Sequence, residues 1–142
     1  MESLEAMDSI LGTPSSQQIL RFLSIRDFLS IKDFEKLTSL SHSQIQYTLQ
    51  NLIKLGLVSR KSRGIYQLNE SPLANNFKKT YLKSTTLYLN EQINLIFGLI
   101  DKGENDDAFV VFESIMKKYQ AILEEYFADI MENLSHQMLE IV

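Results

Sequence analysis

The sequence predicts a mainly α-helical fold with a small β-hairpin, followed by two long C-terminal helices. Its 142 residues are 44% hydrophobic and include only five Gly and two Pro, so the chain is long and apolar enough to bury a core. Over most of its length apolar residues recur every three or four positions, which is the period of an amphipathic helix. The hairpin is expected within residues 57–68, where two short β-prone runs flank a polar turn at Lys61-Ser62-Arg63-Gly64.

Capping residues mark two helix starts in the first third of the chain. Thr13-Pro14 combines a capping side chain with a proline at the first helical position, and predicts a helix to about Ile25. A short amphipathic lead-in over residues 1–12 precedes it, and Phe28-Leu29-Ser30 is expected to be a short extended connection. Ser30 and Asp33 have the spacing of a capping box and predict a second helix.

A third helix is predicted to begin after Ser41, which forms an S-x-x-Q capping box with Gln44. Gly56 is expected to end this helix in the left-handed conformation. The apolar stripe that would face the core consists of Ile45, Leu49, Leu52 and Leu55.

The C-terminal half carries the longest helical patterns. Ser71-Pro72 repeats the start signal of a capping residue and a proline, and the pattern continues to about Lys102-Gly103. After an acidic loop, the alternation of three and four residues runs without a miss from Phe109 to Ile130, which predicts a second long helix. We therefore expect one domain over residues 1–70 and a pair of long helices over 71–142.

Charge is distributed unevenly along the chain. The whole chain has a formal net charge of −4, yet residues 21–63 hold eight basic and three acidic side chains, a balance of +5. The remainder then carries −9. Because nucleic-acid phosphates respond to the local potential, this asymmetry fits a basic binding module joined to an acidic body.

The segment Leu37–Leu68, with the sequence LTSLSHSQIQYTLQNLIKLGLVSRKSRGIYQL, resembles the winged helix-turn-helix domains of ArsR/MarR-type regulators. The upstream run ILGTPSSQQILRFL is similar to their first helix, and Leu55-Gly56-Leu57-Val58 is the most specific part of the resemblance. The resemblance implies a winged helix-turn-helix DNA-binding domain over residues 1–70 with a dimerisation region after it. It further implies a sequence-specific, double-stranded-DNA-binding transcriptional regulator that acts as a homodimer.

In this interpretation the third helix enters the major groove, where Gln pairs with adenine and Ser bonds to bases or phosphates. The basic hairpin would contact the phosphate backbone or a narrow, A·T-rich minor groove. The expected DNA-binding residues are Ser41, His42, Ser43, Gln44, Gln46, Tyr47, Gln50, Lys54, Arg60, Lys61 and Arg63.

The two long helices are expected to form the homodimer interface and to set the spacing of the two recognition helices. Eight of the fourteen aromatic residues lie between Tyr81 and Phe127. In MarR-like proteins a cleft between the dimer helices and the DNA-binding domain can bind aromatic effectors, so the resemblance leaves open a small-molecule effector for this chain. The predicted interface residues are Leu82, Leu89, Ile93, Ile96, Ile100, Phe109, Phe112, Met116, Tyr119, Leu123, Tyr126 and Ile130.

A second hypothesis keeps the fold and changes the role. The expected recognition helix contains no Arg, and the net charge is negative, both of which favour a winged-helix interaction module that joins a larger complex through its C-terminal helices. The chain has no Cys and only two separated His, so we expect no metal and no cofactor. It shows no phosphate loop or nucleophile motif, and we expect a cytoplasmic non-enzyme with no membrane partner.

Overall fold

The computed structural model describes the backbone of residues 4–141 and the side chains from Asp8 to Ile141. The chain divides into two compact units between Lys83 and Ser84, and this division falls inside a single long helix. The sequence places its domain boundary earlier, between residues 70 and 71, before that helix begins. We call residues up to Lys83 the N-terminal unit and residues from Ser84 the C-terminal unit.

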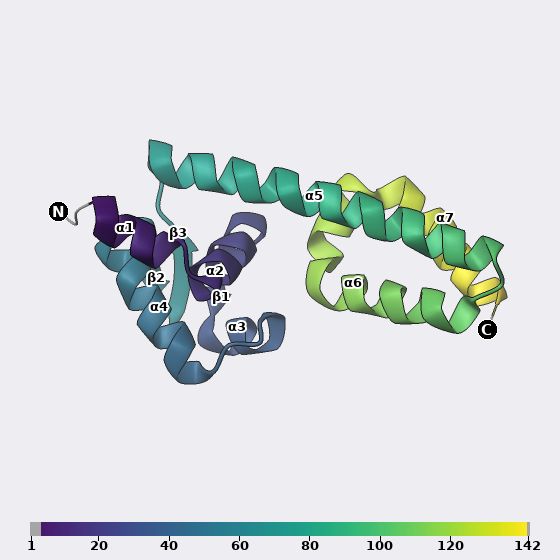
Figure 1. Cartoon of the computed structure of the whole chain (residues 1–142), viewed down its shortest axis with the longest axis horizontal. Coiled ribbons are helices and arrows are strands. Elements are labelled where there is room, and N and C mark those ends of the chain that lie inside the picture. The colour runs from purple at the N-terminus through teal and green to yellow at the C-terminus, as the bar shows by residue number, and fades with distance from the viewer. Residues whose placement is uncertain (1–3, 142) are drawn as a thin grey trace. The chain divides into compact units, whose positions relative to one another are not determined.

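Along the chain, the N-terminal unit consists of four short helices, then a hairpin, and then the first turns of the long helix (Figure 1). Helix α4 contacts both α2 and α3, and α1 contacts α2. The helices are α1 (Leu4–Leu11), α2 (Pro14–Ile25), α3 (Ile31–Leu37) and α4 (His42–Lys54).

Three local caps fix where these helices begin, as the sequence predicts. The Thr13 hydroxyl accepts a hydrogen bond from the Ser16 N–H at 3.2 Å, and Pro14 occupies the first helical position. Ser30 with Asp33, and Ser41 with Gln44, each form a complete capping box. The predicted starts of α2, α3 and α4 are therefore confirmed.

The sheet has three antiparallel strands in the order β1-β3-β2: β1 (Leu29–Ser30), β2 (Val58–Ser62) and β3 (Ile65–Leu68). The hairpin of β2 and β3 is confirmed, and Gly56 and Gly64 have φ of 77° and 74° at the two turns that require it. The expectation of a mere connection at residues 28–30 is incomplete, because Leu29 and Ser30 pair with Tyr66 and Ile65.

The core of the N-terminal unit collects one apolar face from each helix. The α4 stripe of Ile45, Leu49 and Leu52 is buried, as its spacing predicts, and it meets buried side chains of α2 and α3. Burial of this face determines which side of α4 remains in solvent. The other fully buried large side chains of this unit are Ile19, Leu20, Leu23, Leu29, Phe34 and Leu57.

The C-terminal region forms three helices: α5 (Pro72–Asp101), α6 (Asn105–Tyr126) and α7 (Ala128–Glu140). The start and end of α5 are confirmed. The second continuous long helix is wrong, because the backbone leaves helical geometry at Tyr119 (φ −125°, ψ 19°) and again at Phe127 (φ −130°, ψ 23°). In Figure 1, α7 runs in the direction opposite to α6 after this break.

The break has a clear packing reason. By turning back, α7 buries Met131, Leu134 and Met138, which a straight continuation of α6 would leave without cover. The buried positions on α6 are Ala108, Ile115, Ile122 and Leu123, and the first three each lie one residue before a predicted position (Phe109, Met116 and Leu123). The expected stripe therefore forms the flank of the buried face, and only Leu123 of it is fully buried.

Candidate nucleic-acid interface

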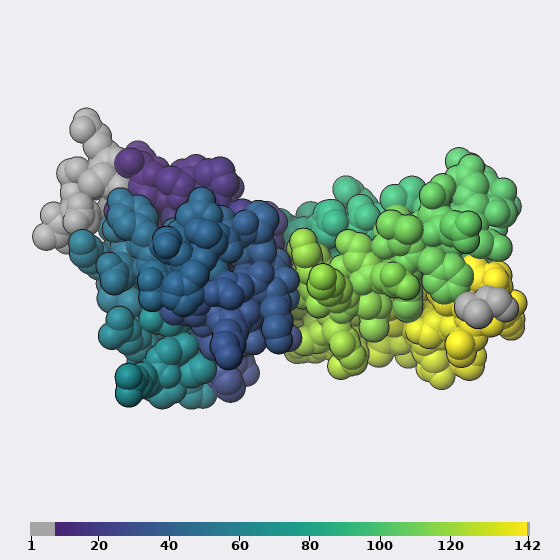
Figure 2. All heavy atoms as spheres, turned by 90° about the horizontal axis from the view of Figure 1, so that it is seen from below, coloured from purple at the N-terminus to yellow at the C-terminus, as the bar shows by residue number. Residues whose placement is uncertain are grey.

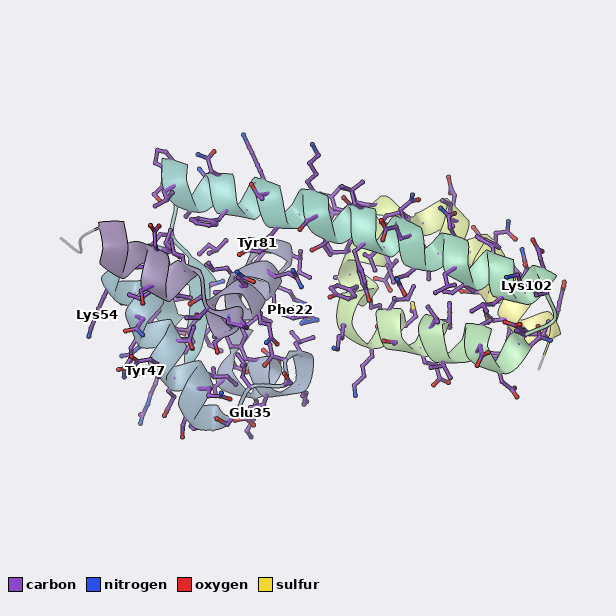
Figure 3. All side chains as sticks on the ribbon, in the orientation of Figure 1. Phe22, Glu35, Tyr47, Lys54, Tyr81 and Lys102 are labelled. Atoms are coloured by element: carbon purple, nitrogen blue, oxygen red, sulfur yellow. The ribbon has the colours of Figure 1, made fainter. Side chains whose placement is uncertain are left out.

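Helix α4 presents one polar stripe to solvent. Ser43, Gln46, Tyr47, Gln50 and Lys54 are all exposed. Steps of three or four residues lead from Ser43 to the neighbours Gln46 and Tyr47 and on to Gln50 and Lys54, so all five share one face of the helix. The side chain of Tyr47 is 70% exposed, an unusual position for an aromatic residue. Figure 3 labels Tyr47 and Lys54, which both project from α4 on the side away from α2 and α3. The stripe combines amide, hydroxyl, aromatic and cationic groups along a rigid support.

The capping box fixes the start of this stripe. The Gln44 Oε1 accepts a hydrogen bond from the Ser41 N–H at 2.9 Å, and the Ser41 Oγ accepts one from the Gln44 N–H at 3.2 Å. Both side chains are exposed and satisfy backbone groups of the helix start. Ser41 and Gln44 therefore position α4, and the oxygen of each is already in use.

His42 has a partner that the sequence did not reveal. Its Nδ1 lies 2.8 Å from Oε1 of Glu35, which belongs to α3, and both side chains are exposed. The contact places a carboxylate beside the N-terminal end of α4, next to the expected DNA-binding residues. His42 therefore links α3 to α4, rather than presenting a free ring to solvent.

The hairpin holds its cations against aromatic rings. The register shifts between Arg60, which opposes Tyr66, and Ser62, which opposes Ile65, so Lys61 is the extra residue of a β-bulge. The Lys61 Nζ lies 4.0 Å from the centre of the Phe28 ring, and Arg60 lies over the Tyr66 ring at 5.9 Å. These contacts orient two positive charges on one strand.

The turn of the hairpin adds a third cation. Arg63 is exposed and precedes Gly64, whose positive φ closes the turn. The Arg63 charge therefore lies at the solvent-exposed tip of the hairpin.

An open groove brings the stripe and the hairpin together. It has a volume of about 650 Å³ and contains three of the expected residues, Gln50 and Lys54 from α4 and Arg60 from β2. In Figure 2 the blue surface that includes α4 is continuous with the teal surface of the hairpin region. Ser41 to Gln46 lie outside this groove, at the other end of the helix. Its full lining is Gln50, Ile53, Lys54, Val58, Ser59, Arg60 and Asn69.

The two units carry opposite charge. Residues 1–83 hold eleven basic and seven acidic side chains, a net charge of +4. Residues 84–142 hold three basic and eleven acidic side chains, a net charge of −8. The candidate interface therefore lies on the cationic unit, and the overall charge of −4 conceals it.

Sequence reasoning missed six residues of this surface: Phe28, Glu35, Ile53, Val58, Ser59 and Asn69. Phe28 is 48% exposed, and an aromatic residue just before a short extended segment was a usable signal. Asn69 donates from Nδ2 to the Gly56 carbonyl at 2.6 Å and ties the end of β3 to the end of α4. No local pattern links these two positions, because the sheet alone brings them together.

The twelve predicted interface residues occupy three kinds of position. Four of them, Leu89, Ile93, Ile96 and Leu123, are buried within the chain, so their apolar surface is already covered by its own helices. Two, Tyr126 and Ile130, are exposed, by 51% and 42%. The remaining six are half-buried: Leu82, Ile100, Phe109, Phe112, Met116 and Tyr119.

The aromatic groups at the start of α5 form a small cluster in the N-terminal unit. Phe77 and Tyr81 stack with ring centres 6.2 Å apart, and the Arg21 guanidinium lies 6.0 Å from the Tyr81 ring. Burial raises the pKa of the Tyr81 phenol, and the nearby Arg21 charge opposes that rise. Tyr81 is therefore a neutral phenol over the physiological pH range.

Among the side chains that the structure describes, Asp8 to Ile141, no group of three or more His, Asp or Glu is arranged to hold a metal ion. Over the same part of the chain, no helix has the length and hydropathy needed to cross a membrane. No family model, curated protein or solved structure matches the chain.

Proposed function

We propose that the N-terminal unit is a winged helix-turn-helix head that binds double-stranded DNA, and that the chain is a transcriptional regulator rather than an enzyme. In this proposal α4 enters the major groove and the β2–β3 hairpin lies on the phosphate backbone or in the minor groove. The observation that carries the proposal is the exposed stripe from Ser43 to Lys54 on a helix whose opposite face is fully buried, next to three hairpin cations.

The stripe offers chemistry for reading bases. Gln46 and Gln50 each present an amide that pairs with the adenine edge, and Ser43 bonds either to bases or to phosphates. Tyr47 adds an apolar ring that contacts thymine methyl groups. Lys54 and the hairpin cations supply the charge that neutralises phosphates.

The roles of these residues divide into sequence reading and general attraction. Gln46→Ala and Tyr47→Ala are expected to change which duplex sequence is preferred, because their side chains face base edges. Arg63→Ala is expected to weaken binding to all duplexes alike, because it contacts phosphates. If all three variants lost the same DNA affinity for every duplex sequence, the result would contradict the placement of α4 in the major groove.

Fluorescence anisotropy with labelled duplexes at two salt concentrations tests the proposal. The complete chain should bind at low salt and lose affinity steeply on addition of salt, with a slope of about 0.9 per neutralised phosphate. Lys102→Ala is the control for Arg63→Ala, because it also removes one exposed positive charge, but at the end of α5 in the acidic C-terminal unit. It should leave DNA affinity unchanged. Absence of binding at low salt would reject the proposal.

We further propose that the regulator is a homodimer joined through its C-terminal helices. The exposed Tyr126 and Ile130 supply apolar surface for a second copy, together with the half-buried flank of α6. The four buried residues of the predicted interface stabilise the helices that present this surface. Sedimentation equilibrium measures the mass directly. A chain that is still monomeric at about 100 μM would reject the homodimer, because a dissociation constant of that size corresponds to only about 5.5 kcal/mol of association free energy.

A second candidate function is supported by the same exposed residues and by the charge of −8 on the C-terminal unit. A winged-helix interaction module would use this acidic, partly apolar surface to join a larger complex with a basic partner. Failure to bind duplex DNA, combined with a monomeric chain, would favour this alternative.

A further inference from the structure

The groove between α4 and β2 has a composition that DNA binding alone does not account for. Its base is apolar: Val58 is 1% exposed, and Ile53 is half-buried. The phosphate groups of DNA have no apolar body to place on such a surface. The apolar base therefore points to a different kind of ligand.

The rim of the groove is cationic and rich in hydrogen-bonding groups. Lys54 is exposed on one wall and Arg60 on the other, and no acidic residue is among those that line the groove. Gln50 and Asn69 add side-chain amides. Two positive charges across an apolar base complement a molecule that has an anionic head and an apolar body.

Both walls are held in place by contacts inside the N-terminal unit. The guanidinium of Arg60 lies 5.9 Å from the centre of the Tyr66 ring, and that ring is buried. The Asn69 amide donates to the Gly56 carbonyl at 2.6 Å, which joins the end of β3 to the turn after α4. A ligand therefore meets a largely preformed site and loses less affinity to ordering the protein.

We propose that this groove binds an amphipathic organic anion. Its carboxylate or phosphate lies between Lys54 and Arg60, and its apolar body packs on the half-buried Ile53 and on the small exposed part of Val58. The volume of about 650 Å³ is in the range of ligand sites for small organic molecules.

Occupation of the groove has a consequence for regulation, and this part rests on the proposed function. Gln50, Lys54 and Arg60 belong both to the groove and to the expected DNA interface. A bound anion neutralises cations that would otherwise meet phosphates, so the ligand and duplex DNA compete.

Titration of the ¹⁵N-labelled chain with dodecanoate, below its micelle concentration, tests the site by nuclear magnetic resonance. We expect saturable shifts confined to amides of residues 50–60 and Asn69, with a dissociation constant of about 1 mM or tighter. Inorganic phosphate tests the anion without an apolar body, and dodecyltrimethylammonium tests the apolar chain with the opposite charge. Neither should shift these amides at the same concentration.

Variants separate the two halves of the site. Lys54→Gln and Ile53→Asn should each weaken dodecanoate binding by about tenfold, the scale of one lost charge or apolar contact. Lys36→Gln removes the same charge from an exposed position on α3 outside the groove and should leave binding unchanged. Dispersed amide spectra of each variant establish that it is folded.

The remaining outcomes overturn the proposal. Equal shifts with phosphate would reduce the groove to a simple anion site, and equal shifts with the cationic amphiphile would reduce it to general apolar adsorption. Absence of shifts with dodecanoate would reject the site itself. DNA binding is measured separately, without dodecanoate, so the proposed function can fail or stand independently of this result.

Discussion

The two units of this chain are built in opposite ways. The N-terminal unit has short helices with side-chain caps, a net charge of +4 and a polar stripe on the exposed face of α4. The C-terminal unit has the 22-residue helix α6, a net charge of −8 and exposed apolar side chains such as Tyr126 and Ile130. The contrast is the basis of the proposal that the first unit binds duplex DNA and the second associates with another protein surface.

The largest expected effect tests whether the two units, which differ in composition, also unfold independently of each other. Leu49→Ala in α4 and Leu134→Ala in α7 each remove a fully buried side chain and should cost about 2–5 kcal/mol of unfolding free energy. Residue-resolved amide exchange should show faster exchange in the unit that carries the substitution. Faster exchange throughout both units in either variant would show that the chain unfolds as one body.

The next effect tests the association surface of the C-terminal unit. Ile130→Asp places a charge in the proposed dimer interface and should raise the dimer dissociation constant about tenfold or more. The control, Leu139→Asp, makes the same change at a more exposed position of the same helix outside that interface. Sedimentation equilibrium measures both variants, and equal dissociation constants would place the interface elsewhere.

A smaller effect tests the link between the α4 cap and the stripe. Ser41→Ala removes the capping oxygen and should cost about 1 kcal/mol of stability, together with a loss of affinity for duplex DNA. Ser71→Ala is the matched control, because its Oγ caps α5 through the Ala74 N–H at 3.1 Å. Urea unfolding should give similar losses for both, while DNA affinity falls only for Ser41→Ala.

The smallest effect concerns alkaline pH. The pKa of Tyr81 is raised in the folded chain, chiefly by burial, so the folded state holds the phenol proton more tightly than the unfolded state. The resulting stabilisation is complete below the ordinary tyrosine pKa of about 10 and is lost as pH rises through the raised value. Urea unfolding at a series of pH values should show a shallower alkaline decline in Tyr81→Phe. An identical decline in both proteins would contradict this assignment.

Local signals predicted most of the N-terminal unit. A capping box uses residues three positions apart, and Gly56 and Gly64 adopt positive φ because of their own backbones, so these features are visible in a short segment. The pairing of β1 with β3 joins Leu29 to Tyr66, and no local pattern carries that information. The groove was missed for the same reason, because Asn69 and Ile53 come from different elements.

The C-terminal region shows the limit of periodicity. The break after Tyr126 contains neither Gly nor Pro, and the apolar alternation continues through it to Ile130. The helix α6 ends there because the chain gains hydrophobic free energy by burying Met131, Leu134 and Met138 against the other helices, which is a tertiary effect. Eight of the eleven expected DNA-binding residues lie on α4 or its cap, and there the predicted helix and its capping box are confirmed.

The central claim is that α4 and the basic hairpin bind duplex DNA while the acidic unit does not. Amide exchange of the complete chain, measured at low salt with and without a duplex, tests this claim most directly. We predict slower exchange in residues 41–54 and 58–64 and no change in residues 105–140. Protection confined to residues 105–140, or none anywhere, would contradict the account.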